Sequence, residues 1–287
     1  MDRSSSSTRN LFQRLGFGAL SLMTIATIVP IISVVVYIIS KGSPAISWDF
    51  LSLPPHDGMR AGGILPAIVG TLYLTLGTAL FAVPLGIAAA IYLSEYAPDN
   101  RWTRLIRIAI INLAGIPSVV YGLFGLGLFV IFLKFGTSIL SASLTLSIMT
   151  LPVIISTSEE ALRAVPQPFR TVSISLGATR WQTIRRIVLK EALPGILTGV
   201  ILGLERAAGE TAPILFTGAA FFLPRLPGSP FEATMALPYH LFVISTQVPE
   251  MPIKIQFGTA LVLLVFVLGM NITATVIRSR ARAKRQW

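Results

Sequence analysis

Three charged side chains stand together in a stretch that is otherwise apolar enough to cross a membrane, residues 193–216. They are Glu205, Arg206 and Glu210. A guanidinium binds an oxyanion through two parallel hydrogen bonds. Ionisable residues inside a membrane are functional by default. The cluster therefore favours a contact site for an anion in transit over the alternative, a buried ion pair that only fixes helix packing.

The cluster sets requirements for the element that carries it. Three charges near a helix centre cost about 8–10 kcal/mol of insertion free energy, and the apolar residues of this span return about 3–6 kcal/mol. The span must therefore turn this side toward protein or water. A helix that starts near Pro194 rises about 1.5 Å per residue, which places Arg206 about 18 Å along it, near the middle of the bilayer.

Spacing assigns different roles to the three charges. Arg206 and Glu210 are four residues apart, so they share one helix face and can pair. Glu210 would hold Arg206 in place and keep the site weak enough to release an anion. Glu205 is rotated about 100° from Arg206 and needs a partner on another helix or another subunit. Gly203 and Gly209 would let a neighbouring backbone approach closely. The predicted pathway residues are Glu205, Arg206, Glu210 and Thr211.

The composition places the chain in a membrane. Of 287 residues, 53% are hydrophobic and 12% are charged, and the net charge is +11. In soluble domains, roughly a quarter of the residues are charged. The basic residues fall at the ends of apolar runs, as topology signals do, and not on a face that could read nucleic acid. We predict an all-α protein that contacts lipid and no nucleic acid. With no cysteine, disulfides and thiolate metal sites are excluded.

Six apolar runs are long enough to cross the hydrocarbon core, which takes about 20 residues. The first run follows three arginines, but it is too long for a signal peptide, so we expect it to be retained as a helix. The six runs cover residues 15–39, 64–93, 105–133, 137–157, 193–217 and 257–277.

The loops between these runs differ in basic residues. Seventeen Lys and Arg residues fall on one side of the membrane and five on the other. Since the basic side is cytoplasmic, we predict that both termini lie inside. Residues 1–14 and 279–287 are then cytoplasmic tails of one transmembrane domain, residues 15–278. In the outer loop, residues 218–256, repeated prolines interrupt any long helix; we expect one short helix near 232–245.

The longest inner loop, residues 158–195, carries its own folding signals. A short helix fits residues 169–176, and Gly177 suits its C-terminal cap because glycine takes a left-handed conformation without steric cost. Thr179 and Gln182 form a capping-box pattern that starts a second, basic amphipathic helix. Such a hairpin suits either a surface of anionic lipid or a groove in a partner protein.

The same loop resembles the EAA loop of ABC importer permeases. The segment SLGATRWQTIRRIVLKEALPG has the glycine and the later Leu-Pro of that signature. It departs from the signature at Thr171, Val172 and Ser173, where the family often has Glu-Ala-Ala, and at Lys190, where the family has proline. In that family the loop inserts into a cleft of a separate ATPase subunit. The resemblance assigns the ATPase contact to Gly177, Ala178, Thr179, Arg180 and Trp181.

Four further segments resemble the PstA-type permease subunit of bacterial high-affinity phosphate importers. They are GGILPAIVGTLYLT (62–75), NLAGIPSVVYGLFGLG (112–127), RAAGETAPILFT (206–217) and MALPYHLFVIST (235–246). The resemblance implies a MetI-like permease fold with six transmembrane helices. It also implies that the chain moves inorganic phosphate across the bacterial cytoplasmic membrane by alternating access. Two alternatives stay open, the sister PstC-type subunit and a permease for another oxyanion, sulfate or molybdate.

The partners that the resemblance implies are a PstC-type permease, a homodimeric PstB-type ATPase and a periplasmic PstS-type phosphate-binding protein. We expect the binding protein on residues 218–256. No Gly-Lys dipeptide occurs, so the chain has no P-loop, and ATP with Mg²⁺ is expected on the ATPase. His56 and His240 lie about 180 residues apart, and neither belongs to a cluster of acidic or cysteine ligands, so we expect no metal site. The chain shows no catalytic constellation of an enzyme, and a self-contained channel would need no ATPase.

Overall fold

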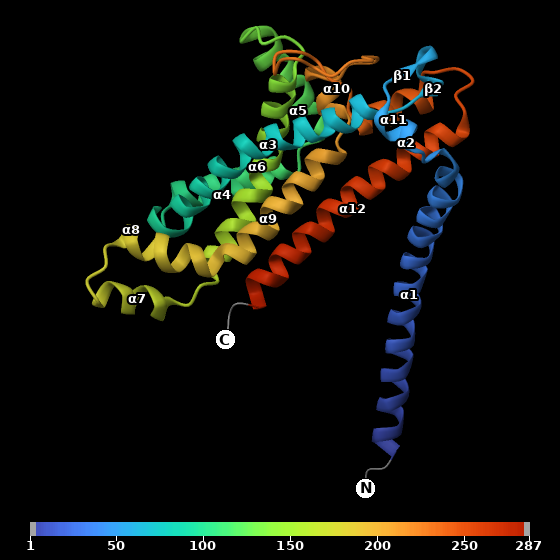
Figure 1. The fold of residues 1–287 in the computed structure, drawn as a ribbon. Helices are drawn as coiled ribbons and strands as arrows, with labels where there is room; N and C mark the ends of the chain where they lie inside the picture. Colours follow the sequence, from blue (N-terminus) through green and yellow to red (C-terminus); the bar gives the residue numbers. More distant parts are fainter. Residues whose placement is uncertain (1–3, 284–287) are drawn as a thin grey trace.

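The computed structural model describes residues 4–283 of the chain. Helices dominate these residues, which also contain a two-stranded antiparallel hairpin of β1 (Pro55–His56) and β2 (Ala61–Gly62). Helix α6 (Ile139–Arg163) lies at the centre and packs mainly on α3 (Leu65–Ile91) and α9 (Leu189–Gly209). Figure 1 shows these three helices in the body of the bundle, with one long helix standing away from it.

The segments that can cross a membrane agree with the six apolar runs. Within the described residues, five helices are long and apolar enough, and one bent helix pair completes the set. The six are α1 (Ser4–Gly42), α3, the pair α4 (Arg101–Ala114) with α5 (Ser118–Gly125), α6, α9 and α12 (Ile253–Ala283). Since α1 begins at Ser4 and α12 continues to Ala283, much of each expected tail is a helical extension of a span.

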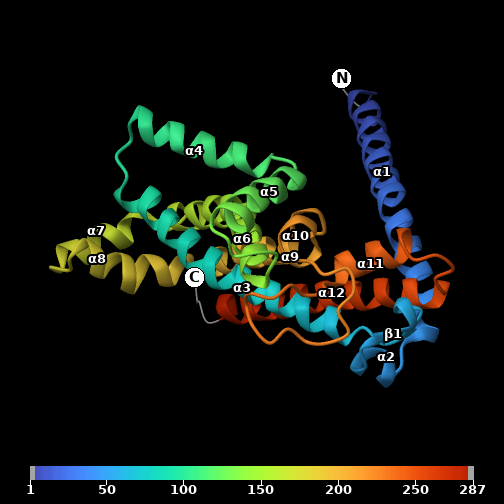
Figure 2. The ribbon, with the colours of Figure 1, turned by 90° about the horizontal axis from the view of Figure 1, so that it is seen from above.

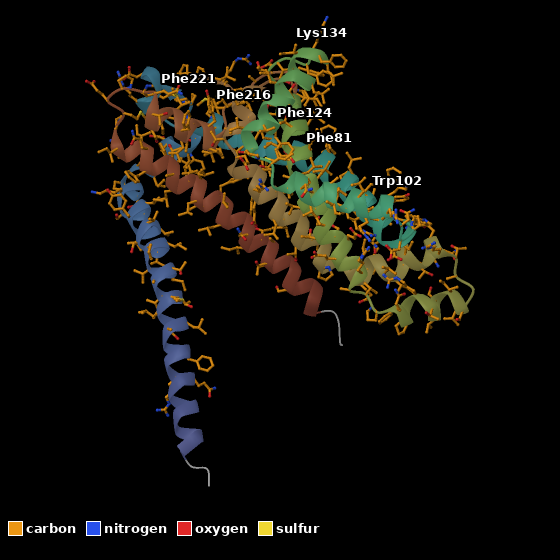
Figure 3. The ribbon with its side chains drawn as sticks, turned by 180° about the vertical axis from the view of Figure 1, so that it is seen from behind. Phe81, Trp102, Phe124, Lys134, Phe216 and Phe221 are labelled. Atoms are coloured by element: carbon orange, nitrogen blue, oxygen red, sulfur yellow. The ribbon has the colours of Figure 1, made fainter. Side chains whose placement is uncertain are left out.

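The third span is bent, whereas the sequence predicted one run over 105–133. The axis turns by 101° between α4 and α5. Pro117 is the N-cap of α5 and has extended backbone; its missing N–H and its ring prevent α4 from continuing. The span continues from α5 into the π-helical segment η4 (Leu126–Phe132). Figure 2 shows α4 apart from α3, and Figure 3 places Trp102 and Lys134 at opposite ends of the span.

The fifth span is also broken, which corrects the expected helix over 193–217. Helix α9 begins at Leu189, contains Pro194 and ends at Gly209. A second helix, α10, covers Ala212–Thr217 and has Pro213 in its first turn. The Pro213 ring would collide with the carbonyl of Gly209 in a continuous helix, which explains the break. Because α9 starts before Pro194, Arg206 lies in its last turn, further along than the expected 18 Å.

Small residues let α9 approach α6 closely. Three glycines repeat every four residues along one face of α9, and a Cβ atom at each would meet α6 at close range. Close backbone approach through such residues is typical of membrane helices. The facing pairs are Gly195 with Ala161, Gly199 with Thr157, and Gly203 with Ile154. The expectation for Gly203 therefore holds, but nothing lies within 4 Å of a Cβ at Gly209, so that glycine faces open space.

Helix α1 contacts the bundle through its C-terminal end. The apolar window of α1 has none of its residues buried. Its contact is with α12, where the Tyr37 and Phe257 rings meet edge to face at 5.4 Å and Gly42 lies against the backbone of Phe257. Figure 1 shows the rest of α1 diverging from the bundle. So large an exposed apolar surface requires lipid or another subunit as its neighbour.

The connections at the end of the bundle where α1 meets α12 are short (Figure 1). They are η1 (Ser43–Ala45), α2 (Trp48–Ser52), η2 (Asp57–Met59) inside the β-hairpin, and α11 (Leu237–Thr246). The short helix that we expected near 232–245 is α11, displaced toward the C-terminus. Residues Met235, Ala236 and Leu237 are buried, and the Leu237 N–H donates to Thr71 Oγ1 of α3 at 2.8 Å. The 218–256 segment therefore enters the core instead of forming only an outer loop.

Candidate functional site

Arg206 and Glu210 form the expected pair at the end of α9. Arg206 Nε lies 3.4 Å from Glu210 Oε1, and the two side chains are 36% and 18% exposed. Over residues 4–283, the structure gives the two terminal nitrogens of Arg206 no hydrogen-bond partner. A guanidinium has five N–H donors in a fork that fits two oxygens of an oxyanion. This pair leaves that fork unoccupied.

The break between α9 and α10 places this pair at a helix end. Glu210 is the C-cap of α9 and has extended backbone (φ −77°, ψ 138°). Thr211, the fourth predicted pathway residue, follows Glu210 directly and is the N-cap of α10. Non-helical backbone at membrane depth is tolerated where it is buried in protein or lines a water-filled cavity. The sequence signal for this break was Pro213.

Glu205 points to a different neighbour, as its position in the sequence predicted. Its side chain has a hydrogen bond with Asn271 of α12, while its Oε1 is buried and has no partner among the described residues. The partner is thus another helix of the same chain. Glu205 links α9 to α12, whereas Arg206 and Glu210 link no two helices.

Tyr121 of α5 belongs to this region, and sequence reasoning missed it. The residue is 5% exposed, and its hydroxyl donates to the Leu113 carbonyl of α4 at 2.7 Å across the bend. It lies near enough to Arg206 for the two side chains to interact electrostatically. A tyrosine in an apolar run gives no distinctive spacing signal, so only the fold could bring it to Arg206.

The inner loop folds as the hairpin that its signals predicted. The hairpin consists of α7 (Gln167–Ser175), α8 (Arg180–Thr183) and the π-helical segment η5 (Ile184–Val188), which leads into α9. Gly177 has a φ of +85° in the turn. Thr179 and Gln182 form both hydrogen bonds of a capping box. The short helix, the glycine turn and the capped second helix are all confirmed.

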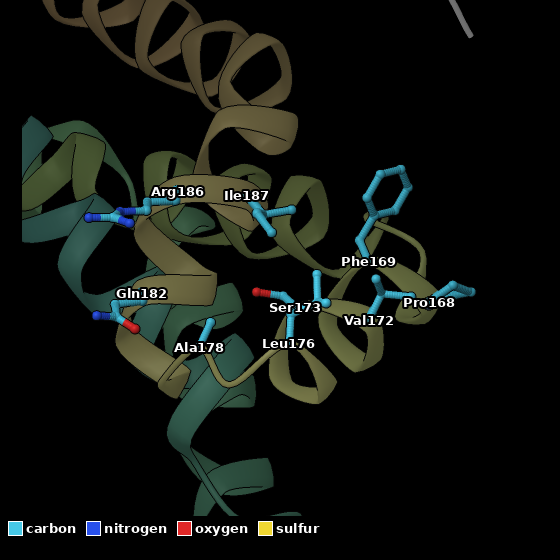
Figure 4. A pocket seen from close by; sticks show the side chains of 9 residues that line it. All are labelled: Pro168, Phe169, Val172, Ser173, Leu176, Ala178, Gln182, Arg186 and Ile187. Atoms are coloured by element: carbon cyan, nitrogen blue, oxygen red, sulfur yellow. The ribbon is translucent and has the colours of Figure 1, made fainter.

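An apolar groove runs between the two arms of this hairpin. Its volume is about 510 Å³. Figure 4 shows side chains from α7 on one side of the groove and from α8 and η5 on the other. Leu176 is 83% exposed and Val172 is 58% exposed. The residues that line the groove are Pro168, Phe169, Val172, Ser173, Leu176, Ala178, Gln182, Arg186 and Ile187.

All of the predicted ATPase-contact residues except the half-buried Ala178 are exposed. Trp181 is 53% exposed and Ala178 lines the groove. Arg180 also reaches the end of α3: its guanidinium donates to the Glu95 carbonyl and lies 4.9 Å from the centre of the Tyr96 ring. Sequence reasoning missed Glu95 and Tyr96, because both lie at the end of an apolar run far from the hairpin in sequence.

The two histidines lie in different environments. His240 in α11 is 2% exposed, and burial lowers the pKa of its imidazole from 6.5 to about 4. Its Nδ1 has no partner among the described atoms. His56 lies in β1 and is exposed. In the part of the chain that the structure describes, no group of three or more His, Cys, Asp or Glu residues could hold a metal ion.

Comparisons with known proteins agree with this architecture. The family model described as "Binding-protein-dependent transport system inner membrane component" matches residues 82–282. The probable ABC transporter permease protein YqgI of Bacillus subtilis is 32% identical, with 93% of this chain and 95% of that protein covered. The phosphate transport system permease protein PstA 1 of Mycobacterium tuberculosis is 33% identical, with 91% of this chain and 86% of that protein covered.

A solved structure gives the same fold at low sequence identity. The inward-facing MetNI methionine ABC transporter matches with a TM-score of 0.62 at 17% identity, and covers 76% of this chain and 95% of that chain. The MetI-like fold that the sequence predicted is confirmed.

Proposed function

Because this chain belongs to the family of binding-protein-dependent transport system inner membrane components and is thus a permease subunit of an ABC importer, we propose that its cargo is inorganic phosphate. The chain is not an enzyme, and a separate ATPase subunit hydrolyses ATP. The name of the PstA 1 relative supports phosphate. YqgI, at a similar identity, is named only as a permease, so the cargo is argued from the site.

The observation that carries the proposal is the unoccupied fork of Arg206. Arg170 in the hairpin uses its donors on Glu95 and on two backbone carbonyls, as a structural arginine does. Arg206 makes one contact of 3.4 Å within its own helix. An ion pair inside one helix fixes no packing between helices, which weighs against the purely structural alternative. The free guanidinium nitrogens suit two oxygens of an anion.

The Glu210 carboxylate beside Arg206 favours phosphate over sulfate. Phosphate keeps a proton at neutral pH and donates a hydrogen bond, whereas sulfate is fully ionised and only accepts. The Glu210 carboxylate, which lies 3.4 Å from Arg206, can accept from a protonated oxyanion but repels one without a proton. An acceptor placed in the site favours a cargo that has the matching donor.

The assembly that we propose follows from the family and from the exposed surfaces. A second permease of the PstC type would cover exposed apolar faces and close the pathway beside Arg206. A homodimeric PstB-type ATPase with bound ATP and Mg²⁺ would dock on the hairpin, at Gly177, Ala178, Thr179 and Trp181. A PstS-type phosphate-binding protein would dock at the opposite end, on the exposed part of residues 218–256.

The sidedness is part of the same proposal. The hairpin is basic and lies at the opposite end of the bundle from β1, β2 and α11 (Figure 1). With the basic end in the cytoplasm, both termini lie on the cytoplasmic side of the bacterial cytoplasmic membrane. Alternating access is then a rigid-body movement of packed helices around the Arg206 region.

Uptake measurements on the assembled importer in proteoliposomes test the cargo. We expect ATP-dependent uptake of labelled phosphate that excess unlabelled phosphate abolishes and that excess sulfate or molybdate leaves unchanged. Uptake of labelled sulfate or molybdate, with no phosphate uptake, would assign the chain to the other oxyanion. Flux that continues without the ATPase would instead indicate a channel.

A further inference from the structure

The end of α3 is a meeting point for three other parts of the chain. After Ile91 the helix widens into a π-helical segment, η3 (Tyr92–Tyr96). The Ala97 N–H bonds to the Tyr92 carbonyl at 2.8 Å, one residue further back than in an α-helix. The Leu93 carbonyl therefore loses its usual donor inside the helix. This widened turn leaves polar groups available for contacts from outside.

The first contact comes from α7. Arg170 and Glu95 form a two-pronged ion pair, with Nη2 to Oε1 at 2.7 Å and Nε to Oε2 at 3.3 Å. Their side chains are 13% and 8% exposed. Arg170 also donates to the carbonyls of Val165 at 2.6 Å and Leu162 at 2.8 Å. The guanidinium thus joins η3, the end of α6 and α7 in one rigid unit.

The second contact comes from α8, on the other arm of the hairpin. Arg180 donates to the backbone carbonyl of Glu95 and lies over the Tyr96 ring. The two arms therefore meet the same residue, one at its carboxylate and the other at its carbonyl. A hairpin held at both arms cannot shift relative to α3 without breaking these bonds.

The third contact comes from α4. Arg107 Nη2 donates to the freed Leu93 carbonyl at 2.8 Å, and its Nε lies 2.8 Å from Glu159 of α6. Arg163 also reaches Glu159, at 2.9 Å. The widened turn is thus linked to the first half of the bent span, which leads through its 101° turn to α5 and Tyr121 beside Arg206.

We propose that Glu95 is a positioning residue that latches the hairpin to α3, so that a displacement of α7 and α8 is transmitted to α3 and, through Leu93 and Arg107, to α4. This inference rests on one element of the proposed function, which is that an ATPase moves the hairpin. The latch couples ATP hydrolysis to reorientation of the pathway. It requires no contact between Glu95 and the cargo.

The first test is the ratio of phosphate uptake to ATP hydrolysis in the assembled importer. Glu95→Gln keeps the size of the side chain and removes its charge, so we expect the ATPase to remain bound while uptake per ATP falls at least about fivefold, the lower end of coupling between distant sites. The matched control is Asp49→Asn, which removes the charge of an exposed carboxylate in α2. Its ratio should equal that of the wild type. An unchanged ratio of uptake to ATP hydrolysis in Glu95→Gln overturns the latch. This includes the case in which both rates fall by the same factor.

A second variant covers the case in which Glu95→Gln fails to assemble. Arg170→Lys keeps the charge, but lysine cannot span Glu95 and both carbonyls. We expect a reduced ratio in this variant as well. A wild-type ratio would overturn the latch.

A distance measurement tests the latch independently of the cargo. The chain has no cysteine, so spin labels at Thr171→Cys on α7 and Leu85→Cys on α3 are unique in it. With the latch intact, the distance between the labels should stay the same with and without ATP. With Glu95→Gln it should change on ATP addition; an invariant distance in this variant would contradict the proposal. If the wild type shows no phosphate uptake, the cargo assignment fails and this measurement still decides on the latch.

Discussion

Arg206 Nε and Glu210 Oε1 lie 3.4 Å apart across the last turn of α9, and both belong to the same helix end. The carboxylate touches one edge of the guanidinium, and among residues 4–283 the two terminal nitrogens have no hydrogen-bond partner. The pair therefore orients Arg206 without saturating it. In the pathway that we propose, an anion would meet two donors and one repelling charge there, which would make the contact specific and short-lived.

Removal of the Glu210 charge should slow release. In Glu210→Gln the repelling carboxylate is gone, so phosphate binds Arg206 more tightly and leaves more slowly. We expect turnover to fall about tenfold, the effect of roughly 1.4 kcal/mol of extra binding, with a lower KM. Steady-state uptake by the assembled importer measures both parameters. A raised KM with unchanged turnover would show that Glu210 does not act on release.

The left-handed turn at Gly177 should be required for ATPase docking. A Cβ at Gly177 meets nothing within 4 Å, so a substitution acts through backbone strain at φ +85°. Gly177→Val should cost about 1–3 kcal/mol at this position and release the ATPase during purification. Gly177→Asn is the matched control, because asparagine tolerates this conformation, and it should keep the ATPase bound. Release by both variants would assign the effect to lost contact surface instead.

Close packing of α9 on α6 should depend on Gly199. A Cβ there would collide with the Thr157 side chain, whereas Gly127 has nothing within 4 Å. Gly199→Leu should lower stability by about 1–3 kcal/mol or more through overpacking, and Gly127→Leu should not. Thermal unfolding of the two purified variants measures the difference. Equal melting temperatures of the two variants would show that the packing of α9 on α6 does not depend on a glycine at position 199.

Acid should destabilise the chain through His240. Burial keeps this imidazole neutral in the folded state, with a pKa of about 4 instead of 6.5, while the unfolded chain takes up a proton below pH 6.5. Stability is therefore unaffected above pH 6.5 and falls by about 3 kcal/mol in total as the pH drops from 6.5 to 4. Thermal unfolding of wild type and His240→Gln between pH 7 and 5 measures this. Identical pH dependence in the two proteins would exclude His240 as the cause.

Local signals predicted the hairpin and the spans well. Gly177, Thr179 and Gln182 act on their immediate neighbours in sequence, so their roles could be read before the fold was known. The length of an apolar run is also a property of neighbouring residues, and it predicted where each membrane segment lies. The pairing of Arg206 with Glu210 followed from helical spacing alone.

Long-range contacts could not be predicted in this way. Glu95 and Arg170 are 75 residues apart, and no periodicity connects them. The family resemblance assigned Arg180 to the ATPase contact, but the hydrogen bond between its side chain and the Glu95 carbonyl has no signal in the sequence. The breaks before Pro117 and Pro213 were also missed, because Pro84, Pro152 and Pro194 remain inside continuous helices and only tertiary packing separates the two outcomes.

The most direct test of the account is phosphate uptake by the assembled importer that carries Arg206→Ala. Loss of two hydrogen bonds from a charged donor, about 3 kcal/mol, should reduce uptake about a hundredfold, while the ATPase and the sister permease still co-purify. Arg104→Ala, which removes an exposed arginine of α4, should leave uptake unchanged. Near-normal uptake by Arg206→Ala would contradict the assignment of Arg206 to the anion pathway.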